Sequence, residues 1–392
     1  MTTSQPMAFD AEKESLVLDA VARFVEREIK PVAQRLEHAD EWPVGIVAGM
    51  REMGLFGCII REEYGGLGLS ASTYAKVVER IARVWMSVSG IINSHLIMAA
   101  CVQRNGTEAQ RQRFLPLFAR GELRGGLALT EPDCGTDLQA VRTVARRDGD
   151  HYVINGTKTW ISNGIHGQAF AVLVKTDPQA QPRHLGMSLF ICEKGPGFTS
   201  TRKLEKLGYK GIDSAELVFD NFRVPGTNLV GKENEGVKIV MSGLDLERAL
   251  VAALCVGICE RALELGVEYA RTRVQFGKPI GSFQMVQAML AEMYTETEAM
   301  KTLVWRTLAE VNDLEVGSGG RGAAHKITAA SILYAGEACN RILNHAVQIH
   351  GGSGYIWESE INRLFRCIKI LEIGAGTSEV RKMIIAEELL RN

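Results

Sequence analysis

The chain has 392 residues, with 45 Lys and Arg against 46 Asp and Glu, and 46% of its residues are hydrophobic. This length allows two or three domains with sizeable cores, and the composition excludes a disordered protein. The formal net charge of −1 gives no overall field that would draw the chain to nucleic acid or to an anionic membrane.

The first part of the chain predicts helices. From about residue 10 to 120 apolar residues recur at helical spacing, as between Leu16 and Ile29 just before Pro31. From about 123 to 230 the pattern changes to short runs rich in Val, Ile, Thr and aromatic residues, separated by Gly and Asp. These runs predict antiparallel strands, and Asn155-Gly156 within HYVINGTKTWIS predicts a two-residue type I′ hairpin turn.

Long amphipathic patterns return from about residue 233 and predict a helical bundle. The predicted fold class is therefore α+β and multidomain, with an N-terminal α-helical domain, a middle antiparallel β-barrel domain and a C-terminal four-helix bundle. The expected domain boundaries are 1–122, 123–231 and 232–392. This order of helical, β and helical parts is uncommon enough to narrow the fold by itself.

The cysteines and the N-terminus give an expectation about the compartment. The eight cysteines form no CxxC motif, and MTTSQPMAFDAEKES lacks the apolar core of a signal peptide, which predicts a cytoplasmic protein. The longest apolar stretch, Ala249 to Cys259, is much shorter than the roughly 20 residues that span a bilayer, so no membrane segment is expected. No metal site is expected either, because His345 and His350 do not stand at ligand spacing.

One carboxylate occupies an unusual position in the first C-terminal helix. Glu247 lies three residues after Leu244 and four before Val251, inside the apolar stripe of that helix. A lone Glu more often swings to solvent at the edge of a stripe or pairs with a neighbour such as Arg248. Alternatively, apolar surroundings raise the pKa of the carboxyl and make it a candidate general base. Periodicity alone does not decide between these interpretations.

Four glycine-containing motifs are candidate ligand sites. LALTEPDCGTD at 127–137 joins a strand to a loop that could hold a flavin edge or a thioester, and TRVQFGKPIGSFQ at 272–284 sets basic residues beside glycines, which suits a pyrophosphate. QIHGGSGY at 348–355 and EIGAGTSEVRK at 372–382 lead toward helices, whose N-termini favour anions. Each could also be an ordinary loop or connection. None is a Walker loop, a GxGxxG unit or a GxSxG elbow, so neither a Rossmann-type nucleotide site nor a hydrolase is indicated.

These motifs in this order, together with NGTKTWISNG, resemble the acyl-CoA dehydrogenase family over essentially the whole chain. The resemblance implies bound FAD, an acyl-CoA substrate, an electron-transfer flavoprotein as electron acceptor and a homotetramer built as a dimer of dimers. It also implies flavin contacts in the middle domain, and a pyrophosphate and adenosine contact from a neighbouring subunit. The implied cofactor residues are Leu127, Leu129, Thr130, Gly135, Thr136, Trp160, Ile161, Ser162, Arg273, Gln284, Gln348, Gly351, Gly352, Thr377 and Glu379.

The resemblance also assigns the base. Most members carry the catalytic Glu just before the Gly-Thr of the last motif, where this chain has Ala375, with Gly374 before it. A smaller branch, to which isovaleryl-CoA dehydrogenase belongs, carries the base within LDLER, which stands here at 244–248. The resemblance therefore implies that Glu247 is the base, and this is the residue that the stripe singles out. The implied substrate-binding residues are Thr136, Asp245, Arg248, Gly374 and Ala375.

The expected reaction is α,β-dehydrogenation of a short or branched acyl-CoA to the 2-enoyl-CoA. Glu247 takes the α proton, and a hydride passes from the β carbon to flavin N5. The resemblance implies that a ribityl hydroxyl of FAD and the backbone N–H of Ala375 stabilise the thioester oxygen, as in an oxyanion hole. The alternatives are a flavin-dependent monooxygenase or oxidase, a redox-neutral acyl-CoA eliminase, and a binder that has lost activity.

Overall fold

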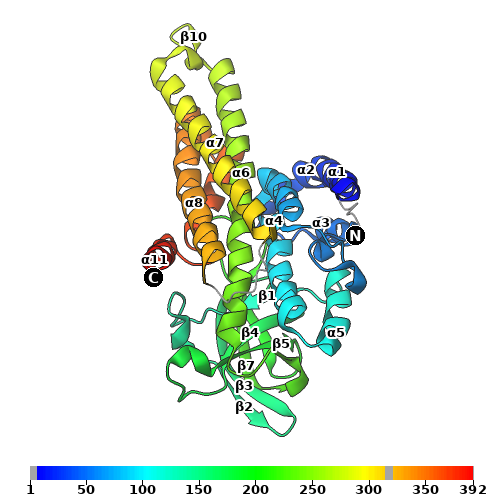
Figure 1. Cartoon of the computed structure of the whole chain (residues 1–392). Coiled ribbons are helices and arrows are strands. Elements are labelled where there is room, and N and C mark those ends of the chain that lie inside the picture. The colour runs from blue at the N-terminus through cyan, green and yellow to red at the C-terminus, as the bar shows by residue number, and fades with distance from the viewer. Residues whose placement is uncertain (1–6, 314–320, 392) are drawn as a thin grey trace, which may run out of the picture.

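The computed structural model describes residues 7–313 and 321–391, and its helices and strands separate into a helical part and a sheet part (Figure 1). The N-terminal helices are α1 (Met7–Phe24), α2 (Lys30–His38), α3 (Val44–Glu52), α4 (Ala71–Asn105) and α5 (Glu108–Ala119). A π-helical turn, Val25–Ile29, joins α1 to α2, because Pro31 follows at once and cannot donate an ordinary helical hydrogen bond.

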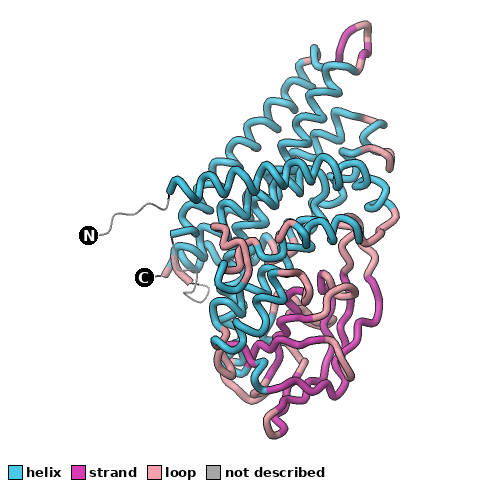
Figure 2. The backbone as a smooth tube through the Cα atoms, turned by 90° about the vertical axis from the view of Figure 1, so that its right-hand side faces the viewer, coloured by secondary structure: helices cyan, strands magenta, loops and turns pink. Residues whose placement is uncertain are grey.

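The sheet part contains eight strands in one sheet, in the order β6-β7-β3-β2-β4-β5-β8 with β1 paired to β4. Their bounds are β1 (Gly125–Ala128), β2 (Val144–Asp148), β3 (His151–Ser162), β4 (Ala169–Lys175), β5 (Met187–Glu193), β6 (Phe198–Lys203), β7 (Ser214–Pro225) and β8 (Leu229–Val230). The sheet is mixed rather than purely antiparallel, because β4 runs parallel to both β1 and β2. Figure 2 shows the strands gathered at one end of the molecule.

The predicted hairpin turn at Asn155-Gly156 is wrong. β3 continues through both residues, and the two-residue turn stands instead at Gly149-Asp150, where Asp148 pairs with His151. Gly156 lies at an irregularity in the pairing of β3 with β7 and has φ +150°, and a Cβ there would overlap Thr143. Close packing and a bulge, not a turn, are therefore the reason for this glycine.

The C-terminal part begins with α6 (Gly236–Thr272), which runs from the sheet to the far end of the molecule (Figure 1). A small hairpin, β9 (Val274–Gln275) and β10 (Lys278–Pro279), leads into α7 (Gln284–Asp313), and α8 (Ala323–His350) returns. The shorter helices are α9 (Gly352–Tyr355), α10 (Glu360–Ile368) and α11 (Ser378–Leu390), of which α10 and α11 pack against α8.

Helix α4 lies against α6 and forms the centre of the fold. It is the one helix in the described residues that is long and apolar enough to cross a membrane, and 94% of its most apolar window is buried inside the protein. Trp85 interrupts it with non-helical φ −153° and ψ 100°. One hydrophobic core includes buried residues of α4, α6, α7 and α8, and a second, smaller core fills the sheet part.

Candidate active site

Glu247 lies on α6 among buried residues, with Leu246 and Arg248 buried on either side of it in the chain. Its carboxylate makes no hydrogen bond or ion pair with any described residue. Burial raises the pKa of Glu247 to about 7, against the lowering effect of the charges of Arg248 and Arg381. A carboxyl with such a pKa is a competent proton acceptor near neutrality, because it is deprotonated in about half of the molecules at pH 7.

Helix α4 provides the wall that Glu247 faces. A Cβ on Gly243, one turn before Glu247 on the same face of α6, would stand 3.4 Å from Cys101 Sγ and 3.6 Å from Ile97 Cγ2. The negative charge of Glu247 also contributes to the raised pKa of Cys101, although burial is the larger cause. The candidate base therefore lies between the two central helices rather than on the outer surface of the bundle.

The segment 374–376 is held beside this helix by two buried arginines. Arg248 Nε donates to the Ala375 carbonyl at 3.2 Å, and Arg381 Nη2 donates to the Gly374 carbonyl at 2.6 Å. Ala375 has φ +56°, and its N–H makes no hydrogen bond within the described residues. A Cβ on Gly374 would stand 3.3 Å from the Ile370 carbonyl oxygen, a close contact, so glycine fits this position best. This arrangement leaves a backbone donor free next to a candidate base.

Asp245 and Arg248, predicted to bind substrate, have partners inside the protein. Both are buried; Arg248 Nη1 donates to Asp245 Oδ1 at 3.0 Å, and His325 Nδ1 lies 2.6 Å from the same oxygen. These contacts tie α6 to α8 and to the Ala375 segment. A role in binding acyl-CoA stays a prediction.

A buried ion pair anchors the loop that follows β1. Lys158 Nζ on β3 donates to Glu131 Oε1 at 2.8 Å and to the Leu129 carbonyl at 2.9 Å, and Glu131 also accepts the N–H groups of Arg142 and Thr143. Burial pushes the pKa of the Glu131 carboxyl up, but the Lys158 charge and these hydrogen bonds outweigh it and hold the pKa below its usual value. Gly135 and Thr136, at the tip of the loop, remain exposed and available to a ligand.

The structure brings the two predicted flavin segments together. Thr159 donates its N–H to the Thr130 carbonyl at 2.9 Å, which places Trp160 and Ser162 beside the loop after β1. Asn163 Nδ2 donates to the Ile91 carbonyl at 3.0 Å and so fastens this end of β3 to α4. Trp160 has φ +61° and its residue is 62% exposed, although it is one of the largest apolar side chains. Ile161, by contrast, points into the sheet core.

The remaining predicted cofactor residues divide between two other places. One group lies at the far end of the bundle, where all of its members are exposed: Arg273, Gln284, Gln348, Gly351 and Gly352. Tyr269 Oη, one turn before Arg273, donates to Ser353 Oγ at 3.2 Å, which joins the hairpin end of α6 to the end of α8. The Arg273 guanidinium has no partner among the described residues, and Phe276 at the hairpin tip is 92% exposed.

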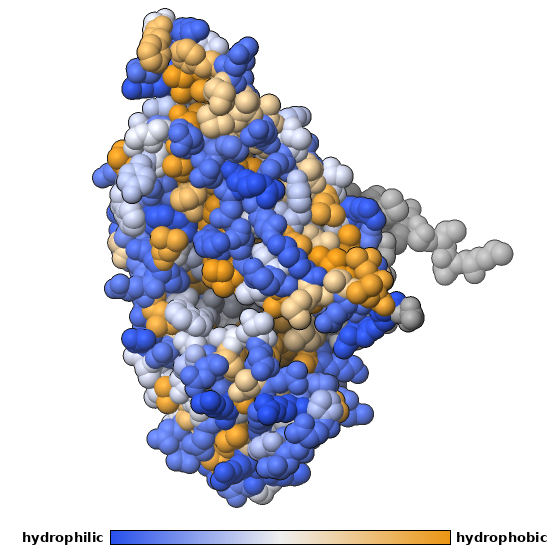
Figure 3. Space-filling view, turned by 90° about the vertical axis from the view of Figure 1, so that its left-hand side faces the viewer, coloured by the Kyte–Doolittle hydropathy of each residue, from blue (hydrophilic) through white to orange (hydrophobic). Residues whose placement is uncertain are grey.

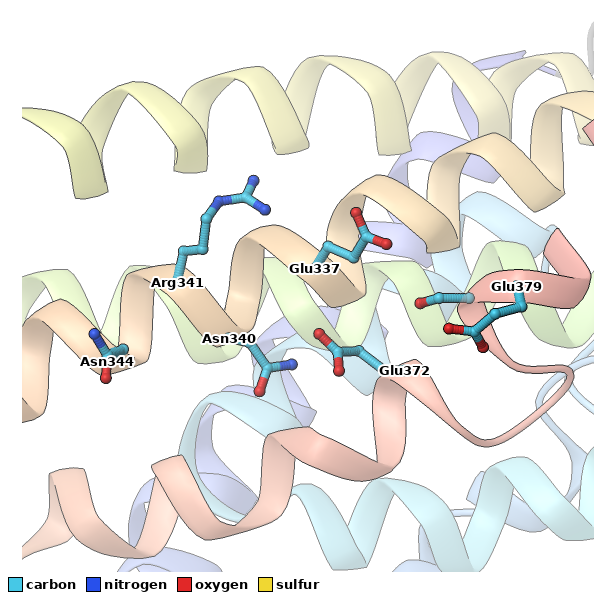
Figure 4. A pocket seen from close by; sticks show the side chains of 7 residues that line it. Glu337, Asn340, Arg341, Asn344, Glu372 and Glu379 are labelled. Carbon is cyan, nitrogen blue, oxygen red and sulfur yellow. The ribbon is translucent and has the colours of Figure 1, made fainter. Parts of the chain in front are cut away.

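The other group is Thr377 and Glu379, at the start of α11. Thr377 Oγ1 caps the helix by accepting the Val380 N–H at 3.3 Å. Figure 4 shows the open pocket beside it, between α8 and α11. Its lining residues are Glu337, Asn340, Arg341, Asn344, Glu372, Ser378 and Glu379. On the face of the molecule shown in Figure 3, the surface is hollowed between the helical part and the sheet part.

Sequence reasoning missed Lys158, Arg381 and Tyr209, whose pKa is raised by burial and by the charge of Glu247. The sequence gives a weak indication for Lys158, because it is a charged residue within a run of strand-forming residues. A lysine buried in such a strand needs a negatively charged partner. Arg381 follows the glycine-rich motif by a few residues, yet nothing in its spacing indicates that it reaches back to Gly374. Tyr209 stands in a loop, and its placement depends on tertiary contacts alone.

Comparisons with known proteins agree with this architecture. Family models for acyl-CoA dehydrogenases match the chain in three parts, the N-terminal domain at 11–122, the middle domain at 126–222 and the C-terminal domain at 234–390. The chain is 38% identical over 396 residues to isovaleryl-CoA dehydrogenase of Oryza sativa subsp. japonica, covering 100% of this chain and 94% of that protein.

Solved structures give the same result. Butyryl-CoA dehydrogenase from Megasphaera elsdenii matches over 100% of both chains, with a TM-score of 0.91 and 32% identity. An acyl-CoA dehydrogenase from Bacillus anthracis in complex with FAD has a TM-score of 0.89 and 30% identity, over 99% of this chain and 68% of that one. Fold and similarity together define a FAD-dependent oxidoreductase. The chain belongs to the acyl-CoA dehydrogenase family.

The residues at the site fit a flavin. The exposed indole of Trp160 offers a flat apolar surface to a ring system, and the loop after β1 presents Gly135 and Thr136 beside it. The free guanidinium of Arg273 matches the charge and geometry of a pyrophosphate. These features are the ones that FAD requires, namely a planar contact, polar groups at the ring edge and a cation for the phosphates.

Proposed function

We propose that this protein oxidises a short or branched acyl-CoA thioester to the 2-enoyl-CoA, with Glu247 as the base that removes the α proton. The observation that carries the proposal is the unpaired Glu247 carboxylate, whose pKa burial raises to about 7. A structural carboxylate in the interior is normally paired, so an unpaired one indicates a functional role.

The α proton of a thioester is a weak acid unless its carbonyl oxygen is stabilised as charge develops. The free N–H of Ala375 is the chain's own donor for that oxygen, and Arg248 holds the same residue through its carbonyl. FAD, when bound, supplies the hydride acceptor for the β carbon. The residues Leu127, Leu129, Thr130, Trp160 and Ser162 hold its ring in this proposal, and Thr377 and Glu379 lie along it.

The missing side chain of Gly374 and the small one of Ala375 support an acyl group that branches near the reacting carbons. A bulky residue at either position would occupy that volume. Asp245 and Arg248 act on the substrate indirectly in this arrangement, because their own contacts orient the Ala375 segment.

The assembly is a homotetramer in this proposal, and a second subunit completes the cofactor site. Arg273 directly follows the last residue of α6 and lies 26 residues after Glu247, so at 1.5 Å per residue the two are about 39 Å apart and cannot contact one reacting centre in one chain. The exposed Phe276 and the unpaired Arg273 then gain partners at a subunit contact. An electron-transfer flavoprotein is the proposed electron acceptor.

The test is anaerobic addition of isovaleryl-CoA, butyryl-CoA and octanoyl-CoA in turn to the purified yellow protein, following the flavin absorbance. Rapid bleaching by isovaleryl-CoA supports the reaction and the branched acyl group together. Bleaching by the straight chains alone keeps the reaction and contradicts the branched group. Absence of bleaching with all three contradicts the dehydrogenase and favours the monooxygenase, eliminase or inactive-binder alternatives.

A further inference from the structure

Tyr209 occupies a fixed position in the loop between β6 and β7. Its backbone is in the left-handed region, with φ +59°, and its N–H donates to Cys367 Sγ at 3.3 Å. The phenol lies directly on Gly90 of α4, where a Cβ would overlap the phenolic oxygen. A side chain at position 90 would therefore displace the phenol, so the glycine leaves room for the tyrosine.

The loop is fastened on the other side of Tyr209 as well. Trp85 Nε1, at the kink of α4, donates to the Lys210 carbonyl at 3.2 Å, and its indole packs where a Cβ of Gly211 would be. The Gly211 N–H donates to Asp40 Oδ1 at 2.9 Å. With its neighbours held by buried contacts, Tyr209 has little freedom to move away from α4.

The pairing of α4 with α6 places this phenol close to Glu247. The two helices are antiparallel, since Gly243 lies level with Cys101, whereas Gly257 lies against the carbonyl of Glu79. Gly90 lies on α4 between Glu79 and Cys101. Its level along α6 is therefore within about one to two helical turns of Glu247. Gly90, Ile97 and Cys101 share one face of α4, because they are separated by seven and four residues.

The hydroxyl of Tyr209 has no hydrogen-bond partner among the described residues, and the side chain is partly buried against the hydrophobic core. Burial raises the pKa of Tyr209, and the charge of Glu247 is the next cause. A large side chain within about two helical turns of the base, without a hydrogen-bond partner for its hydroxyl among the described residues, is placed to limit how far a ligand extends past the base.

We propose that Tyr209 closes the acyl-binding space beside Glu247 and restricts the enzyme to short acyl groups, with Gly90 giving the phenol its place. The inference rests on the proposed function, because it concerns the same thioester substrate. It adds a specificity-determining residue that lies outside the glycine-rich motifs and the LDLER segment.

The test compares butyryl-, hexanoyl- and octanoyl-CoA in the FAD-loaded wild type, Tyr209→Ala and Tyr209→Phe. We expect the wild-type kcat/KM to fall at least tenfold from butyryl to octanoyl, and Tyr209→Ala to raise the octanoyl-to-butyryl ratio at least tenfold. Octanoyl has four more methylenes than butyryl, and a single methylene in a hydrophobic pocket is already worth about 10–200-fold. Tyr209→Phe, which keeps the ring, should keep the wild-type ratio. Dissociation constants of the matching 2-enoyl-CoA products, measured by calorimetry, should follow the same order.

An unchanged ratio in a folded Tyr209→Ala variant overturns the proposal, as does a wild type that accepts all three lengths equally. Should Tyr209→Ala fail to fold, Gly90→Ala gives the second test. Its added methyl should displace the phenol and change the chain-length ratio in the wild-type background, and it should have less effect in Tyr209→Leu. A wild type whose flavin no thioester bleaches contradicts the proposed function itself, so the two failures are distinguishable.

Discussion

The carbonyl oxygen of Ala375 accepts a hydrogen bond from Nε of Arg248 at 3.2 Å, and Arg248 directly follows Glu247 in the chain. The candidate base and the free N–H of Ala375 are thus tied together through one guanidinium. Because the same guanidinium pairs with Asp245, Arg248 links the donor to the helix that carries the base, while Arg381 holds the preceding Gly374 carbonyl.

Arg248→Lys should therefore lower kcat by about 10-fold to 100-fold, because an ammonium cannot hold Asp245 and Ala375 in the same fork and the Ala375 donor moves. The measurement is steady-state kinetics with the best thioester, together with thermal unfolding. Arg261→Lys, on the same helix and paired with Glu360 away from the site, is the matched control. Equal losses of activity in both variants would contradict a positioning role for Arg248.

Glu247→Gln should keep bound FAD and thioester affinity while turnover falls by about 10²-fold to 10⁴-fold, the contribution of a general base. Flavin content, calorimetric binding of the thioester and anaerobic flavin bleaching measure the three quantities. Glu79→Gln is a close control, since burial also raises the pKa of Glu79 to about 7. That residue lies on α4 at the level of Gly257, away from Glu247. Near-normal bleaching by Glu247→Gln would exclude Glu247 as the base.

The pH dependence follows from the same group. Glu247 accepts a proton only when ionised, so kcat/KM should rise with pH through an apparent pKa of about 7 and lose this limb in Glu247→Gln. The pKa of Glu247 is higher in the folded state than its ordinary value near 4.5. The carboxyl therefore makes its full contribution to the free energy of unfolding below pH 4.5, and this contribution is lost as pH rises through about 7. Glu247→Gln should then gain stability over the wild type between pH 5 and 8, as unfolding midpoints at each pH would show. A gap between the two midpoints that does not widen with pH would contradict the raised pKa.

The sequence predicted the helical, sheet and helical order because hydrophobic periodicity is a local property of each segment. It also singled out Glu247, since a charge inside an apolar stripe is visible without a structure. The hairpin at Asn155-Gly156 failed for the opposite reason. The requirement for glycine there comes from Thr143, which lies on a neighbouring segment. The residues next to Gly156 in the sequence do not reveal that contact.

The same limit explains the buried ion pairs and Tyr209. Lys158 meets Glu131 from 27 residues away, and Arg248 meets Ala375 from 127 residues away. Nothing in either segment alone indicates its partner, because the strands and helices that bring the partners together are set by the whole core. The roles of the cofactor residues depended on the family resemblance, not on their local patterns.

Phe276→Asp should weaken assembly and reduce FAD retention together. Its ring is 92% exposed at the hairpin tip, and a subunit contact would bury that apolar surface. Sedimentation velocity and flavin content after gel filtration are the measurements. Leu390→Asp, an exposed apolar residue at the end of α11, is the control for a general effect of surface charge. An unchanged assembly with full flavin would contradict the placement of the contact at this hairpin.

Lys158→Met should destabilise the protein by about 3–5 kcal/mol, because it leaves the Glu131 carboxylate buried without its cation. Glu131 also holds the N–H groups of Arg142 and Thr143, so the loop that carries Gly135 and Thr136 should loosen, and FAD should dissociate more readily. Urea unfolding and flavin release on dilution measure the two effects. Arg142→Gln removes an exposed ion pair with Asp133 from the same loop and should cost no more than about 1 kcal/mol. If the Lys158 variant lost stability but held FAD as tightly as the wild type, the ion pair would support the sheet without positioning the flavin loop.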